Sequence, residues 1–360
     1  MKKKKVYVIC PFPKDVAAGQ RLKYEQYFDD WKKNGYTVKV SPFMSHHMWN
    51  VVYLKGHFFS KFMGTIFGHM CRLRDLFLIF NYDIVYVFMW VTPLGTTIFE
   101  RLVRFISKKL VYDLEDNTVS IMNNEINRIV GSLKNPRKVV YLVKYADHVI
   151  TSSPSLNNYC YKLNNNKKST YISSSVNIRK FLPANLYNNE KKVTIGWTGT
   201  FSSKMYLDLL RNVFIELGKK CEFKLLIIGN FEYIFPEIDL EVVQWSSENE
   251  VEDLQRIDIG VYPLSKDQWV LGKSGLKAIQ YMSFAIPTVA TNVGTTSEII
   301  THLKNGYLVY NEDEWVNSLY ELVNNPTLRK RLGTEARKTV VNNYSTDVIN
   351  EKYLSILDKL

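Results

Sequence analysis

Short apolar runs alternate with amphipathic stretches along the first half of the chain. Runs rich in β-branched and aromatic residues are typical of buried strands, and apolar residues spaced three and four apart are typical of helices. We predict strands at residues 6–10, 37–40, 83–88, 110–114 and 148–151. We predict helices at residues 21–34, 97–107 and 135–146. This alternation predicts a parallel sheet covered by helices.

The alternation restarts after residues 185–192, which are polar and unpatterned and which we interpret as a linker. Further strands are predicted at residues 193–197, 223–228, 241–244, 259–262, 287–290 and 307–309. Further helices are predicted at residues 204–218, 315–323 and 326–342. The sequence therefore predicts two α/β domains in series, residues 1–184 and 193–342. Ligands of open parallel sheets bind at the carboxyl ends of the strands, so we expect a cleft between two facing sheets.

Composition agrees with a folded chain of two domains. The 360 residues are 46% hydrophobic, which is enough for two cores. The four cysteines are scattered without metal-ligand spacing, and we interpret them as reduced thiols in a cytoplasmic protein. The first apolar run is too short for a signal peptide. The uncharged run at residues 84–99 contains Pro93 and Gly95 and is shorter than the roughly 18 residues of a membrane span.

The formal charge of +12 predicts attraction to anionic partners. Lysines that merely keep the protein soluble are the alternative. Residues 54–62 and 71–80 mix cations with aromatic side chains, a composition that suits a membrane interface with anionic lipid. The same stretches could be helices packed on the first sheet, and both interpretations stay open. We expect no nucleic-acid partner.

The loops that follow the strands limit the classes of enzyme to which the chain can belong. Residues 11–21 lack the GxGxxG fingerprint, and the chain has no P-loop, which argues against a simple dehydrogenase and a P-loop ATPase. In the second domain the small residues Gly199 and Thr200 follow a strand, and Lys204 begins the next helix. Such a loop lets backbone N–H groups approach a phosphate. An ordinary turn with a solvated lysine is the alternative.

The segment at residues 269–282 carries the strongest signal. We predict a flexible loop from Gly272 to Gly275 and a helix that begins near residue 274. Lys273, Lys277 and Tyr281 would then lie on one face, with Gln280 beside them. Two lysines on one face repel each other unless an anion such as a diphosphate lies between them. Two lysines reaching out from a partly buried helix are the alternative.

Two further residues and one acidic strand end have two interpretations each. Glu298 follows the Gly294 loop at the start of a helix, where it can cap the helix or accept hydrogen bonds from a sugar. Trp245 stands at a strand end, where it can contact a nucleobase or pack in the core. Asp113, Glu115 and Asp116 close a strand of the first domain, where they can orient acceptor hydroxyls or cap the next helix.

Taken in order, several motifs resemble family 4 (GT4-like) retaining glycosyltransferases. The residues that carry the resemblance lie at 146–152, 176–183, 258–264, 272–277, 280–282, 293–294, 298–299 and 305–306. The resemblance implies the GT-B fold, which has two facing Rossmann-like domains and a C-terminal segment, here residues 343–360, that crosses back to the first domain. It also implies a nucleotide-sugar donor held mainly by the second domain, no essential metal and no other cofactor.

Two departures from the family pattern matter. Many relatives carry two glutamates eight residues apart where this chain has Gly272 and Gln280. Many also carry a His-Asp pair where this chain has Glu115 and Asp116, which is similar to a subgroup with an acidic D-x-E-D motif.

The sequence thus predicts retaining transfer of a sugar from a UDP- or GDP-linked donor to a carbohydrate or lipid-linked acceptor, in bacterial surface-polysaccharide assembly. Candidate catalytic residues are Asp113, Glu115 and Asp116. Candidate donor-binding residues are Gly199, Thr200, Lys204, Trp245, Lys273, Lys277, Gln280, Gly294 and Glu298. A sugar-nucleotide epimerase of the same fold and a non-catalytic protein of the membrane surface are the alternatives.

Overall fold

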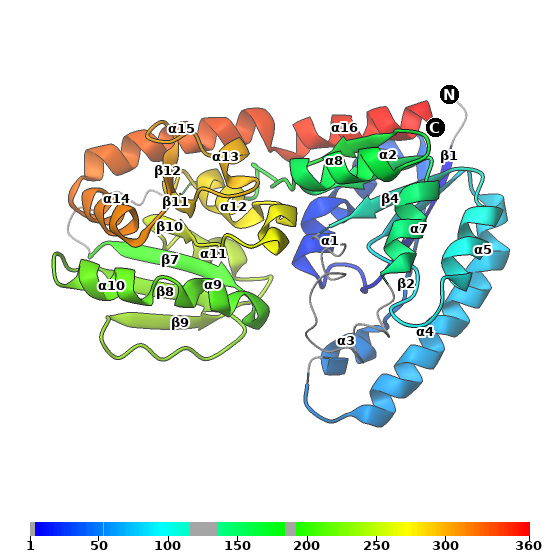
Figure 1. Cartoon of the computed structure of the whole chain (residues 1–360), viewed down its shortest axis with the longest axis horizontal. Coiled ribbons are helices and arrows are strands. Elements are labelled where there is room, and N and C mark those ends of the chain that lie inside the picture. Colours follow the sequence, from blue (N-terminus) through cyan, green and yellow to red (C-terminus); the bar gives the residue numbers. More distant parts are fainter. Residues whose placement is uncertain (1–3, 53, 116–135, 184–191) are drawn as a thin grey trace. The chain divides into compact units, whose positions relative to one another are not determined.

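A computed structural model describes residues 4–52, 54–115, 136–183 and 192–360. The chain divides into two compact units, each built on its own sheet (Figure 1). The first unit comprises Met1–Ser173, Leu271–Ser274 and Ile349–Leu360. The second comprises Ser174–Val270 and Gly275–Val348.

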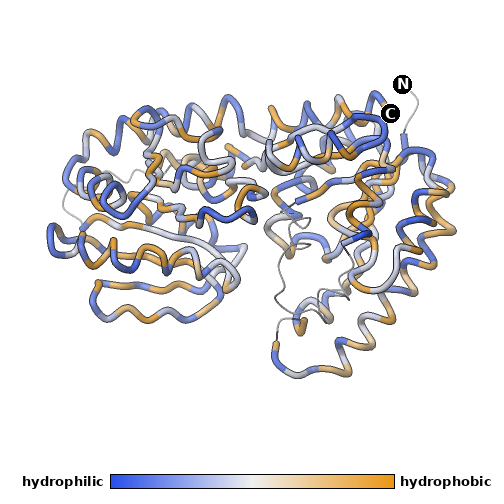
Figure 2. Tube along the Cα trace, in the orientation of Figure 1, coloured by the Kyte–Doolittle hydropathy of each residue, from blue (hydrophilic) through white to orange (hydrophobic). Residues whose placement is uncertain are grey.

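The first unit is built on a six-stranded parallel sheet in the order β2-β1-β3-β4-β5-β6. Its strands are β1 Lys4–Cys10, β2 Tyr36–Pro42, β3 Ile84–Phe88, β4 Leu110–Leu114, β5 His148–Thr151 and β6 Ser169–Tyr171. Successive side chains of a strand face opposite sides, and in β1 both sides are buried. Val6 and Val8 join one core cluster, and Tyr7 and Ile9 join another. Burial on both faces explains why the central strands β1, β3 and β4 are mostly apolar. Figure 2 shows the hydropathy along the chain.

Helices cover both faces of this sheet. They are α1 Ala18–Lys23, α2 Phe28–Lys33, α3 His46–Val52, α4 Phe58–Leu78, α5 Ile98–Ile106, α7 Arg137–Tyr145 and α8 Pro154–Leu163. The last helix of the chain, α16 (Thr346–Lys359), packs on the same face as α2. There the Trp31 indole N–H donates to the side-chain oxygen of Asn350 over 3.0 Å, and Tyr353 packs against Tyr27.

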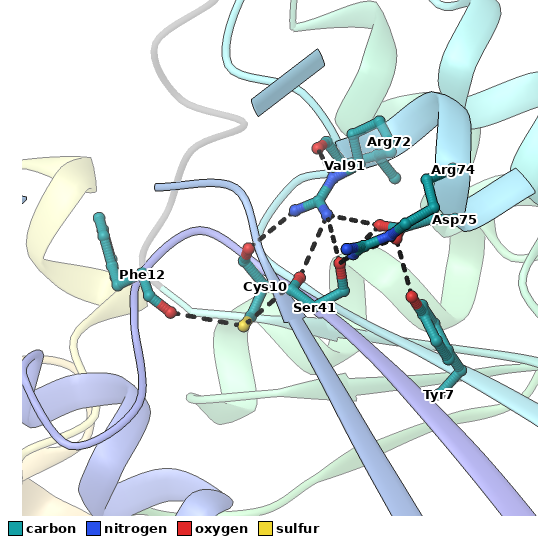
Figure 3. Close-up of polar contacts among 8 residues, drawn as sticks. All are labelled: Tyr7, Cys10, Phe12, Ser41, Arg72, Arg74, Asp75 and Val91. Carbon is teal, nitrogen blue, oxygen red and sulfur yellow. Dashed lines mark hydrogen bonds and ion pairs between the residues drawn. The ribbon is translucent and has the colours of Figure 1, made fainter. Parts of the chain in front are cut away.

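A buried ion pair joins α4 to the carboxyl ends of the strands (Figure 3). Arg72 lies 2.8 Å from Asp75, and both side chains are fully buried. The Arg72 guanidinium donates to the carbonyls of Cys10, Ser41 and Val91, which follow or end β1, β2 and β3. Asp75 in turn accepts from the hydroxyls of Tyr7 and Ser41, each over 2.7 Å. Every charge is thus balanced by hydrogen bonds, as a buried ion pair requires.

The second unit repeats the plan with the strand order β12-β11-β10-β7-β8-β9, again parallel. Its strands are β7 Thr194–Gly199, β8 Lys224–Gly229, β9 Leu240–Gln244, β10 Ile259–Tyr262, β11 Thr288–Thr291 and β12 Gly306–Val309. Its helices are α9 Lys204–Asp208, α10 Arg211–Gly218, α11 Glu250–Leu254, α12 Leu276–Ser283, α13 Thr296–Ile299, α14 Glu312–Asn324 and α15 Pro326–Asn343. One core cluster lies under α10 and α14, and the other under α12.

The two predicted parallel sheets are confirmed. The sequence prediction missed the short strand β6 (Ser169–Tyr171), and the other main differences lie in the helices. The helix expected at residues 21–34 is broken into α1, a 3-10 turn (Glu25–Tyr27) and α2. The break lets Glu25 turn inward, where it accepts from the Asp15 N–H over 3.0 Å and from the Gln20 amide over 2.6 Å. The helix expected at residues 204–218 is likewise broken, between α9 and α10.

Among the described residues, no helix combines the length and the apolarity that crossing a membrane requires.

We predict that Asp75→Asn lowers the free energy of unfolding by about 3–5 kcal/mol, because it leaves the Arg72 charge buried without its counterion. Urea unfolding of the purified chain measures the change. Asp29→Asn is the matched control, since the pair of Asp29 with Lys32 lies at the surface and should matter little. Equal stability of the two variants would contradict the structural role of the Arg72–Asp75 pair.

Candidate functional site

The loop after β7 forms the floor of the candidate site. Gly199 ends the strand, and Thr200 and a 3-10 turn (Phe201–Ser203) lead into α9. A Cβ atom on Gly199 would lie 2.4 Å from the Trp197 ring, 2.6 Å from the Lys277 Nζ and 2.7 Å from the Ser203 Oγ. Only glycine leaves room for this packing, so the loop and the lysine ammonium are fitted to each other.

Lys277 reaches this loop from the first turn of α12. Its Nζ lies 4.3 Å from the centroid of the Trp197 ring and 3.3 Å from the Ser203 Oγ. An ammonium group over an indole face is stabilised by the ring electrons. Trp197 is itself fully buried, so the cation is held in a fixed position at the carboxyl end of β7.

The helix that carries Lys277 begins at Leu276, two residues later than the sequence predicts. Lys273 therefore precedes the helix, in the Leu271–Ser274 segment that groups with the first unit. The helical spacing expected for Lys273 and Lys277 is not realised. The expected polar face is absent as well, because Tyr281 is buried and its hydroxyl accepts from the Thr198 N–H over 2.7 Å. That bond ties α12 to β7.

A second glycine-containing turn lies beside the start of α12. Gly275 has a φ of +74°, which favours glycine, and a Cβ there would lie 2.2 Å from the Ile299 side chain. Ile299 ends α13, the short helix that follows the Gly294 turn. Glu298 is exposed in this helix. The loops after β7 and β11 and the start of α12 thus converge, as expected for the carboxyl edge of one sheet.

A carboxylate that the sequence analysis missed lies behind Lys277. The Gln280 amide donates to the Glu250 side chain over 3.3 Å, and both residues are buried. Thirty positions separate the two in the chain, so no spacing rule links them. Glu250 therefore brings a negative charge to the place where Gln280 has an amide.

The remaining candidates of the second unit lie around the same sheet. The Lys204 Nζ lies 5.4 Å from the Tyr233 ring centroid. Trp245 follows β9, and its backbone N–H donates to the Gly229 carbonyl over 2.8 Å. Its half-buried side chain packs against the core cluster under α12, which fits the core-packing alternative.

At the acidic strand end of the first unit, Asp113 and Glu115 have different environments. Asp113 is fully buried and forms an ion pair of 2.6 Å with Lys23, and the Tyr86 hydroxyl donates to it. Burial raises the pKa of Asp113, and Lys23 opposes this shift. Glu115 is half-buried, and a Cβ on Gly19 would lie 2.8 Å from its Oε2. Asp116 lies outside the described residues.

Asp113 and Glu115 do not form the joint carboxylate pair that strand alternation suggests. The Asp113 side chain has no exposed surface through which to touch a substrate, so its contacts are those of a structural residue. Glu115 retains exposed surface next to the backbone at Gly19. Among the described residues, no group of three or more histidine, cysteine, aspartate or glutamate side chains is arranged to hold a metal ion.

Part of the second unit is similar in sequence to known glycosyltransferases. Residues 179–339 match the family "Glycosyl transferases group 1". The poly(ribitol-phosphate) alpha-N-acetylglucosaminyltransferase of Staphylococcus aureus is 34% identical over 87 residues, which cover 23% of this chain and 18% of that protein. The capsular polysaccharide biosynthesis glycosyltransferase CapM of the same species is 23% identical over 175 residues, or 45% of each chain. The matches thus span less than half the length of these two relatives.

Solved structures match the whole chain. Sucrose-phosphate synthase from Thermosynechococcus elongatus has a TM-score of 0.73 at 13% identity, with 99% of this chain and 98% of that chain covered. Anabaena HepE, solved with UDP-glucose, has a TM-score of 0.65 at 12% identity, with 99% and 100% covered. The two sheets therefore have the GT-B fold.

We predict that Lys277→Met weakens the binding of a nucleoside diphosphate by about 1.5–3 kcal/mol, the range for a lost hydrogen bond to a charged group. Gly199→Ala should have a similar effect, because the new methyl group displaces the Lys277 ammonium. The double variant should lose less than the sum of the two single losses. Calorimetric titration with UDP measures all three, and Lys220→Ala, an exposed lysine of the second unit, is the control. If the losses of binding free energy are additive, Gly199 does not act through Lys277.

Proposed function

We propose that the protein transfers a sugar from a nucleotide-diphosphate donor, UDP- or GDP-linked, to a carbohydrate or lipid-linked acceptor. The observation that carries the proposal is the Lys277 ammonium, fixed over Trp197 and against Gly199 at the carboxyl end of β7. A departing diphosphate accumulates negative charge, and a cation that is already in place stabilises that charge without reorganisation. The group 1 match and the UDP-glucose bound to HepE support this assignment.

The second unit would hold the donor through distinct groups. Lys277 and Lys204 neutralise the diphosphate, and Lys273 stays a candidate on the strength of its place in the sequence. Backbone N–H groups at Gly199, Thr200 and Gly294 add hydrogen bonds to it. Gln280 holds a ribose hydroxyl, and the buried Glu250 fixes the orientation of the Gln280 amide by accepting a hydrogen bond from it. Glu298 accepts from hydroxyls of the sugar.

The first unit would hold the acceptor and the transferring sugar through Glu115. A carboxylate suits sugar hydroxyls and the positive charge that develops at the anomeric carbon. Asp116 is the second candidate, on the strength of its place in the sequence. Retention of the anomeric configuration is proposed from the resemblance to family 4 enzymes. The names of the curated relatives favour an acceptor from the bacterial cell surface.

A sugar-nucleotide epimerase and a non-catalytic protein of the membrane surface are the rivals. An epimerase converts its nucleotide sugar without any acceptor, whereas a transferase releases free nucleotide in proportion to the glycan added. A non-catalytic protein has no affinity for nucleoside diphosphates. Chromatography of nucleotide products with and without acceptor separates the three.

We predict that UDP or GDP stabilises the folded protein without a divalent metal, because lysines rather than a metal ion face the diphosphate. At a concentration one hundred times the dissociation constant, the gain should be about 2.7 kcal/mol. Thermal unfolding with each nucleotide, in the presence of a chelator or of magnesium, tests this. Stabilisation that requires the metal would contradict the assignment.

We predict that Glu115→Gln lowers turnover strongly and leaves nucleotide affinity nearly unchanged. The substitution keeps size and hydrogen bonding and removes only the charge. Asp113→Asn is the contrasting variant, since it breaks a buried ion pair and should lower the free energy of unfolding by about 3–5 kcal/mol. Transfer rate, UDP calorimetry and urea unfolding are measured on both. Normal turnover of Glu115→Gln would make Glu115 structural, and lost UDP binding would place the donor in the first unit.

A further inference from the structure

Helix α4 turns its apolar side away from the protein. Side chains spaced three and four apart form one exposed stripe along the whole helix, namely Phe59, Phe62, Ile66, Met70, Leu73 and Phe77. Phe59 and Phe77 are each 77% exposed. A helix packed on a sheet normally presents such a stripe to the core, so the orientation of α4 is inverted. Figure 2 shows hydrophobic residues along its full length.

The inward side of α4 explains the inversion. It carries Gly68, Arg72 and Asp75, which are all buried. A Cβ on Gly68 would lie 2.5 Å from the Phe43 ring, so the helix backbone approaches the fold closely. Arg72 and Asp75 form the ion pair that bonds to the strand ends. The buried ion pair and the close packing of Gly68 on Phe43 therefore both fix the face that α4 shows to the outside.

Helix α5 extends this surface. Phe99 of α5 lies beside His69 of α4, with ring centroids 5.8 Å apart. The outer side of α5 exposes Ile98, Leu102 and Phe105, of which Phe105 is 88% exposed. We call the exposed stripe of α4 together with these three side chains the α4–α5 face. An apolar patch of this extent on a soluble chain marks an interaction site.

Charge decides what the α4–α5 face binds. Both helices are described in full, and their two acidic side chains, Asp75 and Glu100, are completely buried. Arg101 is exposed on α5. Arg74 of α4 is also exposed, with its guanidinium donating to the buried Asp75 over 3.1 Å. The cluster of Arg72, Arg74 and Asp75 carries a net charge of +1. The face is therefore apolar with a positive rim.

We propose that the α4–α5 face docks onto an anionic lipid surface, with its phenylalanines inserted below the headgroups and its arginines at the phosphates. Apolar side chains flanked by cations suit the boundary between acyl chains and anionic headgroups. A symmetric contact between two copies would set Arg74 and Arg101 near the same cations of the partner, which disfavours self-association. The proposal is independent of the transfer reaction, because it uses none of the residues assigned to the donor or to Glu115.

Sedimentation of the full chain with extruded vesicles tests the proposal. Vesicles of phosphatidylcholine alone are compared with vesicles that also contain phosphatidylglycerol, at low salt and at physiological ionic strength. We expect binding to the anionic vesicles that weakens with salt. Phe62→Ser and Phe105→Ser should each lower the partition coefficient about tenfold, because each removes a large inserted side chain. Arg101→Gln should lower it about fivefold at low salt.

Ile234→Ser is the matched control, since Ile234 is 79% exposed in the second unit and should not affect binding. The phenylalanine variants remove exposed side chains, so thermal unfolding and UDP binding should stay as in the wild type. Absence of binding at low salt overturns the proposal, as does equal binding of all the variants. A dimer in analytical ultracentrifugation that Phe62→Ser dissociates, without vesicle binding, would identify the face as a protein interface instead.

Discussion

Both sheets are parallel, and this constraint brings the carboxyl ends of all strands of a sheet to the same side of it. At the strand ends, backbone N–H and C=O groups no longer bond to a neighbouring strand. They need other partners, because burying them without a hydrogen bond is costly. In the first unit Arg72 supplies the partner for three carbonyls. In the second unit the Tyr281 hydroxyl accepts from the Thr198 N–H. In each unit, one polar side chain from a covering helix thus bonds to backbone groups at the strand ends.

The bonds made by Arg72 and by Tyr281 have different consequences. Tyr281 lies in α12 one turn after Lys277, so the bond that satisfies β7 also aims the ammonium at Trp197 and Gly199. The position of the proposed donor site therefore follows from the bond between Tyr281 and Thr198. Arg72 closes the other sheet from α4, and by turning inward it leaves the phenylalanines of that helix outside. The same requirement thus positions the proposed donor site in one unit and leaves an apolar surface in the other.

Burial also separates residues that look equivalent in the sequence. Asp113 and Glu115 are two positions apart, yet Asp113 pairs with Lys23 inside the first unit while Glu115 keeps exposed surface. Gln280 lacks the charge that many relatives carry at this position, and Glu250 supplies a carboxylate beside it. In both cases the partner comes from a distant part of the chain.

The sequence by itself determined the parallel class of both sheets and all their strands except β6. Residues 110–114, 148–151 and 259–262 were predicted with the bounds that the structure gives them, because buried strands are short runs rich in β-branched and aromatic residues. It also predicted Gly199 and Lys277 as donor-binding candidates, since a loop of small residues after a strand and a lysine after a glycine-containing loop are local signals. Tertiary structure alone decided the start of α12 at Leu276, the pairing of Gln280 with Glu250 and the outward face of α4. These depend on contacts between residues far apart in the chain, and periodicity within a single segment carries no information about such contacts.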